Sequence, residues 1–165
     1  MSPRYDVPKA APEPLRQVQQ FVNSIDRQHE LDWLDDWFAE HRPVEEPERA
    51  RPLREAFRAL ALANNGRPLE PAAVETINAA AARLSLRLDD GGHVQLDDHG
   101  DALDRLVAIA LGAMLDGTWR RLKACRNCRW SFYDHSPNRS ATWCSMQLCG
   151  NRSKTRTYRT RRRAV

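Results

Sequence analysis

Apolar residues recur at intervals of three and four over the first half of the chain, which is the pattern of helices with one buried face. The pattern predicts four helices in this part, over residues 14–27, 30–41, 52–64 and 71–82. Pro71 suits a first helical position, and Asn64, Asn65 and Gly66 suit a helix end because they accept left-handed backbone. The first half of the chain is therefore expected to be helical.

The spacing of apolar residues changes from about four to two after residue 83. Leu84, Leu86 and Leu88 alternate with polar residues, and Val94 and Leu96 alternate again after an Asp-Asp-Gly-Gly turn. This predicts a β-hairpin at about residues 84–97 with one buried face. Because a two-stranded hairpin is marginally stable alone, we expect it to lie on the helices or to join other strands.

A further apolar stripe predicts a long helix from Asp101 to about Lys123, leading directly into a cysteine-rich segment. The fold class is thus mainly α with a small β-hairpin (α+β). We expect a mobile, Pro-rich N-terminus over residues 1–12 and a helical N-terminal domain over 13–118. A four-cysteine zinc finger module with a basic tail is expected over 119–165.

The net charge of +4 is divided unevenly along the chain. Residues 119–165 hold 13 Lys and Arg against 1 Asp, a net of +12, and residues 1–118 hold 13 basic against 21 acidic residues, a net of −8. A segment this basic attracts phosphate and predicts a nucleic-acid-binding end. No apolar run reaches the roughly 18 residues of a membrane helix, and the first residues lack the apolar region of a secretory signal. We therefore expect a cytoplasmic protein with no membrane contact.

All four cysteines fall in the last quarter of the chain, as Cys125, Cys128, Cys144 and Cys149. The spacing, C-x2-C then C-x4-C, lets two pairs of thiolates surround one tetrahedral Zn²⁺. Thiols stay reduced in the cytoplasm, so metal ligation is favoured over disulfides, with free thiols as the alternative. Four sulfur ligands close the coordination sphere, which predicts one structural zinc. His135 could replace one cysteine, although an exposed or capping histidine fits this position better.

Aromatic residues are concentrated between the two cysteine pairs. A module this small needs a core around its metal, so we expect Trp130, Phe132 and Trp143 to form one. Stacking of an aromatic side chain on nucleic-acid bases is the alternative, and it stays open for Tyr133 and Tyr158.

The residues after Cys149 are strongly basic. Arg152, Arg156, Arg159 and Arg163 would share one face of a helix, and the intervening Ser and Thr suit phosphate contacts. A disordered, solubilising tail is the alternative. The candidate nucleic-acid-binding residues are Arg139, Arg152, Lys154, Arg156, Arg159, Arg161, Arg162 and Arg163.

Two sequence motifs resemble known families. Residues 143–146, Trp-Cys-Ser-Met, and 149–152, Cys-Gly-Asn-Arg, together with Cys128, Trp130 and Phe132, resemble the CGNR zinc finger over about residues 119–163. Residues 21–24, Phe-Val-Asn-Ser, are similar to the opening motif of the ABATE domain, which often precedes that finger and is described as a stress-induced transcription regulator. The resemblance implies that the four cysteines bind zinc and that the basic residues bind DNA.

These observations favour a zinc-dependent, DNA-binding transcriptional regulator that is nucleoid-associated when bound. The finger would contact duplex DNA, and the helical domain would sense a small-molecule effector or pair two subunits as a homodimer. An RNA-binding module and a protein-interaction module with a purely structural zinc are the alternatives. The sequence has no Ser/His/Asp order, Gly-rich phosphate loop or open metal site, so we do not expect an enzyme.

Overall fold

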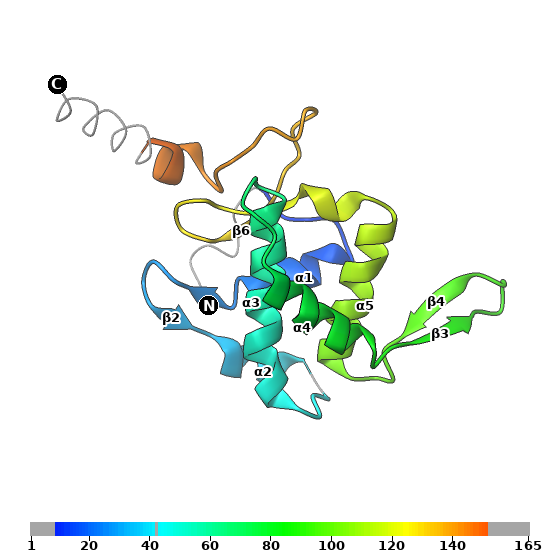
Figure 1. Cartoon of the computed structure of the whole chain (residues 1–165). Helices are drawn as coiled ribbons and strands as arrows, with labels where there is room; N and C mark the ends of the chain where they lie inside the picture. Colours follow the sequence, from blue (N-terminus) through cyan, green and yellow to red (C-terminus); the bar gives the residue numbers. More distant parts are fainter. Residues whose placement is uncertain (1–8, 42, 152–165) are drawn as a thin grey trace, which may run out of the picture.

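The computed structural model describes residues 9–41 and 43–151 of the chain, and it confirms a mainly helical fold with small antiparallel sheets (Figure 1). The α-helices are α1 (Leu15–Val22), α2 (Leu34–Glu40), α3 (Ala50–Ala63), α4 (Pro71–Ala81) and α5 (Ala102–Leu115). The strand pairs are β1 (Ile25–Asp26) with β2 (Leu31–Asp32), β3 (Ser85–Leu88) with β4 (Val94–Asp97), and β5 (Leu122–Ala124) with β6 (Ser131–Tyr133). Short helical turns are η1 (Pro47–Arg49), η2 (Thr118–Arg121) and η3 (Met146–Gly150).

Helix α3 lies at the centre of the molecule and contacts α1, α4 and β5, while α5 packs on α1 and α4 (Figure 1). Phe21 and Phe57 are completely buried between these helices, and their rings meet edge to face with centroids 6.5 Å apart. Trp119 also packs on Phe57, with centroids 6.1 Å apart. The helical core thus extends into η2 and β5, immediately before the first cysteine. No described helix has the length and apolar character needed to cross a membrane.

The first helix is shorter than the apolar spacing predicted, since it ends at Val22 rather than Arg27. Asn23 leaves the helix and binds Ser131 of β6 twice, accepting from its amide at 2.7 Å and donating to its carbonyl at 2.9 Å. Asp26 then accepts hydrogen bonds from two backbone amides in the β1–β2 turn. Residues 25–32 therefore form a hairpin, and the second helix begins at Leu34 instead of Glu30.

The long helix predicted to reach Lys123 ends at Leu115. Gly117 takes a left-handed conformation, with φ of 81°, and Asp116 accepts hydrogen bonds from Thr118. An Asp-Gly pair is a common turn signal, so the helix stops here for a local reason. The chain reaches the first cysteine through η2 and β5 rather than through a continuous helix.

The hairpin at residues 85–97 is present, but its predicted buried face is exposed. Leu86, Leu88 and Val94 are 73%, 67% and 68% exposed, and the hairpin projects from the body of the molecule (Figure 1). Within the part of the chain that the structure describes, the two strands pair only with each other. The alternation of apolar residues identified the strands correctly, and the expectation that this chain's own helices cover them was wrong.

Part of the N-terminal segment lies along the last sheet. Residues 1–8 of the segment expected to be mobile lie outside the described residues. The carbonyl of Lys9 accepts a hydrogen bond from the amide of Tyr133 at 2.8 Å, and Gln19 accepts one from the amide of Ala11 at 2.6 Å. The Lys9 ammonium reaches the carbonyl of Trp143 at 2.7 Å. This segment therefore connects α1, β6 and the chain between the two cysteine pairs.

Candidate metal centre

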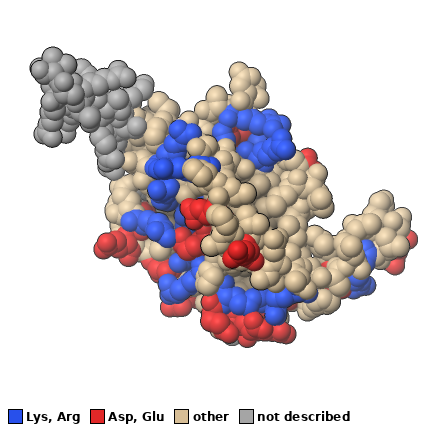
Figure 2. Space-filling view, in the orientation of Figure 1, with Lys and Arg blue, Asp and Glu red and all other residues tan. Residues whose placement is uncertain are grey.

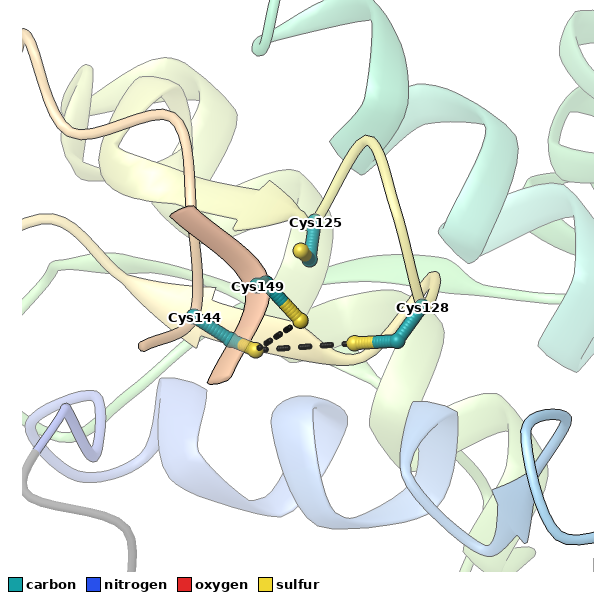
Figure 3. Close-up of side chains that lie close together, drawn as sticks. All are labelled: Cys125, Cys128, Cys144 and Cys149. Atoms are coloured by element: carbon teal, nitrogen blue, oxygen red, sulfur yellow. Dashed lines mark hydrogen bonds between the residues drawn. The ribbon is translucent and has the colours of Figure 1, made fainter. Parts of the chain in front are cut away.

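The four cysteines, far apart in two pairs along the sequence, meet at one buried point (Figure 3). Their Sγ atoms all lie within 4.8 Å of one another. The Sγ atom of Cys144 is 3.5 Å from that of Cys128 and 3.7 Å from that of Cys149. A tetrahedral zinc with Zn–S bonds of about 2.3 Å requires sulfurs about 3.8 Å apart. The donor set and its spacing therefore fit one Zn²⁺ with no ligand position left for water, which is a structural zinc site.

The first pair is held by a tight turn that follows β5. The amide of Arg129 donates to the carbonyl of Cys125 at 2.9 Å, and the amide of Cys125 donates to the carbonyl of Trp130 at 2.9 Å. Arg129 has a φ of 66°, which reverses the chain after Cys128. The two-residue gap between the cysteines thus directs both thiols to the same side.

The second pair is joined by the π-helical turn η3. Ser145 precedes it, and its hydroxyl accepts a hydrogen bond from the amide of Leu148 while its carbonyl accepts from that of Cys149 at 3.0 Å. Gly150 closes the turn against the side chain of Met146, whose Sδ would lie 2.8 Å from a Cβ atom at this position. Cys149 is brought back beside Cys144 as a result.

The close contacts among Cys125, Cys128 and Cys144 shift the pKa values of these thiols in opposite directions. Hydrogen bonding to Cys128 and then to Cys144 lowers the pKa of Cys125 far below its ordinary value. The same contact with Cys125 raises the pKa of Cys128 to about 12, and contacts with Cys125 and Cys128 raise the pKa of Cys144. Four thiolates this close repel one another unless a cation lies between them, so zinc binding must release protons.

Aromatic side chains surround the sulfurs, as the sequence predicted. Trp130 is 4% exposed and Phe132 is completely buried, and both pack in one cluster with the four cysteines, with Trp143 partly buried beside them. The side-chain Nδ2 of Asn127 lies 3.6 Å from Sγ of Cys149 and donates to it. Tyr133 is buried in the helical core instead, which removes it as an exposed stacking platform, and Tyr158 lies outside the described residues.

Two asparagines at the end of α3 fix the centre to the helices, and sequence reasoning missed this role. The Asn65 side chain is buried and donates to the carbonyl of Ala124 at 2.8 Å and to that of Thr142 at 2.9 Å. Asn64 donates to the carbonyls of Trp119 and Leu122. Asn65 thus holds the segments that lead into both cysteine pairs. In the sequence both residues read only as a helix end.

The predicted nucleic-acid-binding residues fall into two groups. Arg139 lies on the described surface at an exposed loop tip, with a φ of 51°. The other candidates, Arg152, Lys154, Arg156, Arg159, Arg161, Arg162 and Arg163, lie outside the described residues. Figure 2 shows blue basic side chains over the finger in the upper part of the view, and acidic side chains interleaved with basic ones near the lower edge.

Several basic residues of the finger are not available to a ligand. Lys123 is buried and paired with Asp134. Arg121 donates to the carbonyls of Asp134 and Ser136 at 2.9 Å. Among the described residues, Arg120, Arg129 and Arg139 make no ion pair. The basic surface of the described part is therefore smaller than the charge count of the sequence suggests.

Two family models match the chain. The CGNR zinc finger matches residues 121–162, and ABATE, described as "Putative stress-induced transcription regulator", matches residues 15–117. The two matches confirm the resemblance on both sides of residue 119. The chain matches no curated protein.

Proposed function

Because this chain belongs to the ABATE family and ends in a CGNR zinc finger, we propose that it is a zinc-dependent DNA-binding transcriptional regulator. The observation that carries the proposal is the combination of a four-thiolate centre with a segment of +12 net charge over residues 119–165. A closed structural zinc shapes a surface and does not catalyse, so the proposal is for a binding protein and not an enzyme. Its location is the cytoplasm, on the nucleoid when bound.

Phosphate contacts provide most of the affinity in this proposal. Arg120, Arg129 and Arg139 offer guanidinium groups on the finger without a carboxylate partner among the described residues. Arginine binds phosphate and the guanine edge through the same fork of donors, so one or two of these groups can supply base specificity. Residues 1–118 carry −8 and repel the same phosphates, which confines DNA to the finger.

The helical domain is proposed to sense an effector or to pair subunits. Support comes from its attachment to the finger, since Asn64 and Asn65, which follow α3, donate to the backbone of β5 and of the segment before Cys144. A shift of α3 on ligand binding would move the segments that carry the zinc ligands. The helical domain could regulate the finger by this route.

The direct test is a selection from a random pool of duplex DNA, carried out with zinc-loaded protein and repeated with a chelator. We expect an enriched motif that disappears when zinc is removed. If about six phosphates are bound, the affinity should fall with salt with a log–log slope near −5. Preference for a structured RNA would favour the RNA-binding alternative, and the absence of salt-sensitive binding to either nucleic acid would exclude the proposal.

Two matched variants test whether the DNA-binding surface lies on the finger. Arg139→Ala should weaken binding to the selected duplex and make the salt slope shallower by about 1, because one phosphate contact is lost. Arg27→Ala removes an exposed arginine from the β1–β2 turn, on the helical domain, and should leave binding unchanged. Equal losses in both variants would argue against a DNA surface on the finger.

A further inference from the structure

The projecting hairpin carries one continuous apolar face. Its register places Leu86 opposite Leu96 and Leu88 opposite Val94, so all four side chains point to the same side of the two strands. Ser85, Arg87, Gln95 and Asp97 occupy the other face. Leu86, Leu88 and Val94 are each at least two-thirds exposed. This is the alternation of a half-buried sheet, but within the described residues its apolar side is largely uncovered, with only Leu96 half-buried.

A hollow lies beside this face, and its lining is mainly apolar, with Glu13, Asp98, Arg105 and Asp116 among the charged residues that line it. Leu86, Val94 and Leu96 form one wall, and residues of α5 and the start of α1 form the other, around a volume of about 710 Å³. Leu115, at the end of α5, lines the hollow and is 86% exposed. Ile109 lines it one and a half turns earlier on the same helix. The apolar face of the hairpin thus continues into a largely apolar hollow.

Charge decides which class of partner suits this surface. Residues 85–98 contain one basic residue, Arg87, and four aspartates. The hairpin therefore repels nucleic acid and anionic membrane surfaces. Asp89 and Asp90 lie at the tip of the hairpin and Asp97 on its polar face, whereas Asp98 at its base lines the hollow. A protein surface that is itself apolar is the partner that fits.

The exposed apolar area matches the core of a dimer interface. Each Leu or Val side chain that becomes buried removes about 60–120 Å² from water. Leu86, Leu88, Val94 and Leu115 together would supply roughly half of the about 800 Å² that each partner buries in a standard interface. Homodimer interfaces are about 65% apolar, and the surrounding backbone and half-buried residues can supply the remainder.

We propose that this surface is the interface of a homodimer, in which the hairpin of each copy lies in the hollow of the other. A projecting element next to a hollow of matching chemistry is self-complementary, and a two-fold axis satisfies both contacts at once and closes the assembly. The finger lies at a different part of the molecule (Figure 1), so it stays free in each subunit. The inference does not depend on DNA binding, because assembly can be measured without nucleic acid.

The test measures the mass of the zinc-loaded full chain by sedimentation equilibrium over a wide concentration range. We expect a reversible equilibrium that reaches twice the chain mass. The double variant Leu86→Ser, Val94→Ser should weaken dimerisation at least about tenfold, since central apolar residues carry most of the affinity of an interface. Leu69→Ser is the matched control, because Leu69 is 55% exposed and does not line the hollow, and it should dimerise like the original protein.

A second measurement uses the unmodified protein, so it does not depend on whether the variant folds. Hydrogen exchange of the unmodified protein should slow at the amides of β3, β4 and the end of α5 as the concentration rises through the dimerisation midpoint. A protein that stays monomeric at every concentration would overturn the proposal. So would a dimer that the double variant, folded and zinc-loaded, forms as tightly as the original.

Discussion

Lys123 lies on β5 with its ammonium 2.8 Å from the carboxylate of Asp134, and both side chains are buried beneath the loop that ends in the second cysteine pair. The same ammonium donates to the carbonyls of Arg139 and Ala141, and the carboxylate accepts from the amides of Ser136 and Ala141. The two side chains of this ion pair thus form hydrogen bonds with backbone groups near both ends of the loop over residues 136–141. The position of Arg139 at its tip depends on this pair.

Breaking this pair should destabilise the protein strongly. Lys123→Met leaves the Asp134 carboxylate buried without its cation, which costs about 3 to 5 kcal/mol of unfolding free energy. The measurement is chemical denaturation in the presence of zinc. Arg120→Met is the control, because Arg120 is exposed, and it should change the free energy by less than about 0.5 kcal/mol. Similar losses in the two variants would mean that the pair contributes nothing specific.

The same pair predicts a dependence on acid. Burial alone would raise the pKa of Asp134, but hydrogen bonds from Lys123 and Ser136 lower it to about 2. A carboxyl whose pKa is lower in the folded state stabilises the fold above its unfolded pKa of about 3.9, and this contribution is lost as the pH falls from about 4 to 2. It amounts to about 2 to 3 kcal/mol. The gap in unfolding free energy between the original protein and Asp134→Asn should therefore be constant from pH 7 to pH 5 and narrow below pH 4. A gap that stays constant down to pH 2 would contradict the low pKa.

The metal centre predicts the zinc content of the protein and the effect of replacing one of its cysteines. The purified chain should contain one zinc per molecule, measured by elemental analysis, and Cys144→Ser should reduce both the zinc affinity and the melting temperature. A chelator should unfold the chain around the four cysteines, since structural zinc contributes on the order of 10 kcal/mol to such sites.

The variant His135→Ala tests whether His135 is a zinc ligand or only a neighbour of the metal centre. His135 is exposed and contacts the carbonyl of Ala10 at 2.9 Å, away from the sulfur cluster. This variant should keep its full zinc content and affinity. Loss of zinc on this substitution would show that the histidine is a ligand in place of a cysteine.

The two asparagines at the end of α3 allow a paired experiment on the coupling between helices and zinc. Asn65→Ala and Asn64→Ala each remove two hydrogen bonds to buried carbonyls and should each cost about 1 to 3 kcal/mol of unfolding free energy. Of the two asparagines, only Asn65 connects the segments before Cys125 and Cys144, so only its variant should release zinc faster to a chelator. Equal rates of zinc release would place the coupling elsewhere.

Features set by local chemistry were predictable from the sequence, and features set by distant contacts were not. The spacing of the cysteines identified the metal centre, and the alternation of leucines identified the hairpin. The end of α5 was also readable, because Asp116 and Gly117 form a turn signal that the broad apolar stripe obscured. The early end of α1 was not, since Asn23 pairs with Ser131, 108 residues further along the chain.

The packing of β5 has a consequence for how such a finger can change over time. Leu122 is fully buried in the same cluster as residues of α1, α3 and α5, so the first strand of the finger is also part of the helical core. In tandem arrays each finger is an independently folded module that can be duplicated or exchanged to give a new binding site. Here a transplanted finger would leave a gap in one protein and expose an apolar strand in the other. New specificity in this architecture must therefore come from point substitutions on its surface rather than from recombination of whole fingers.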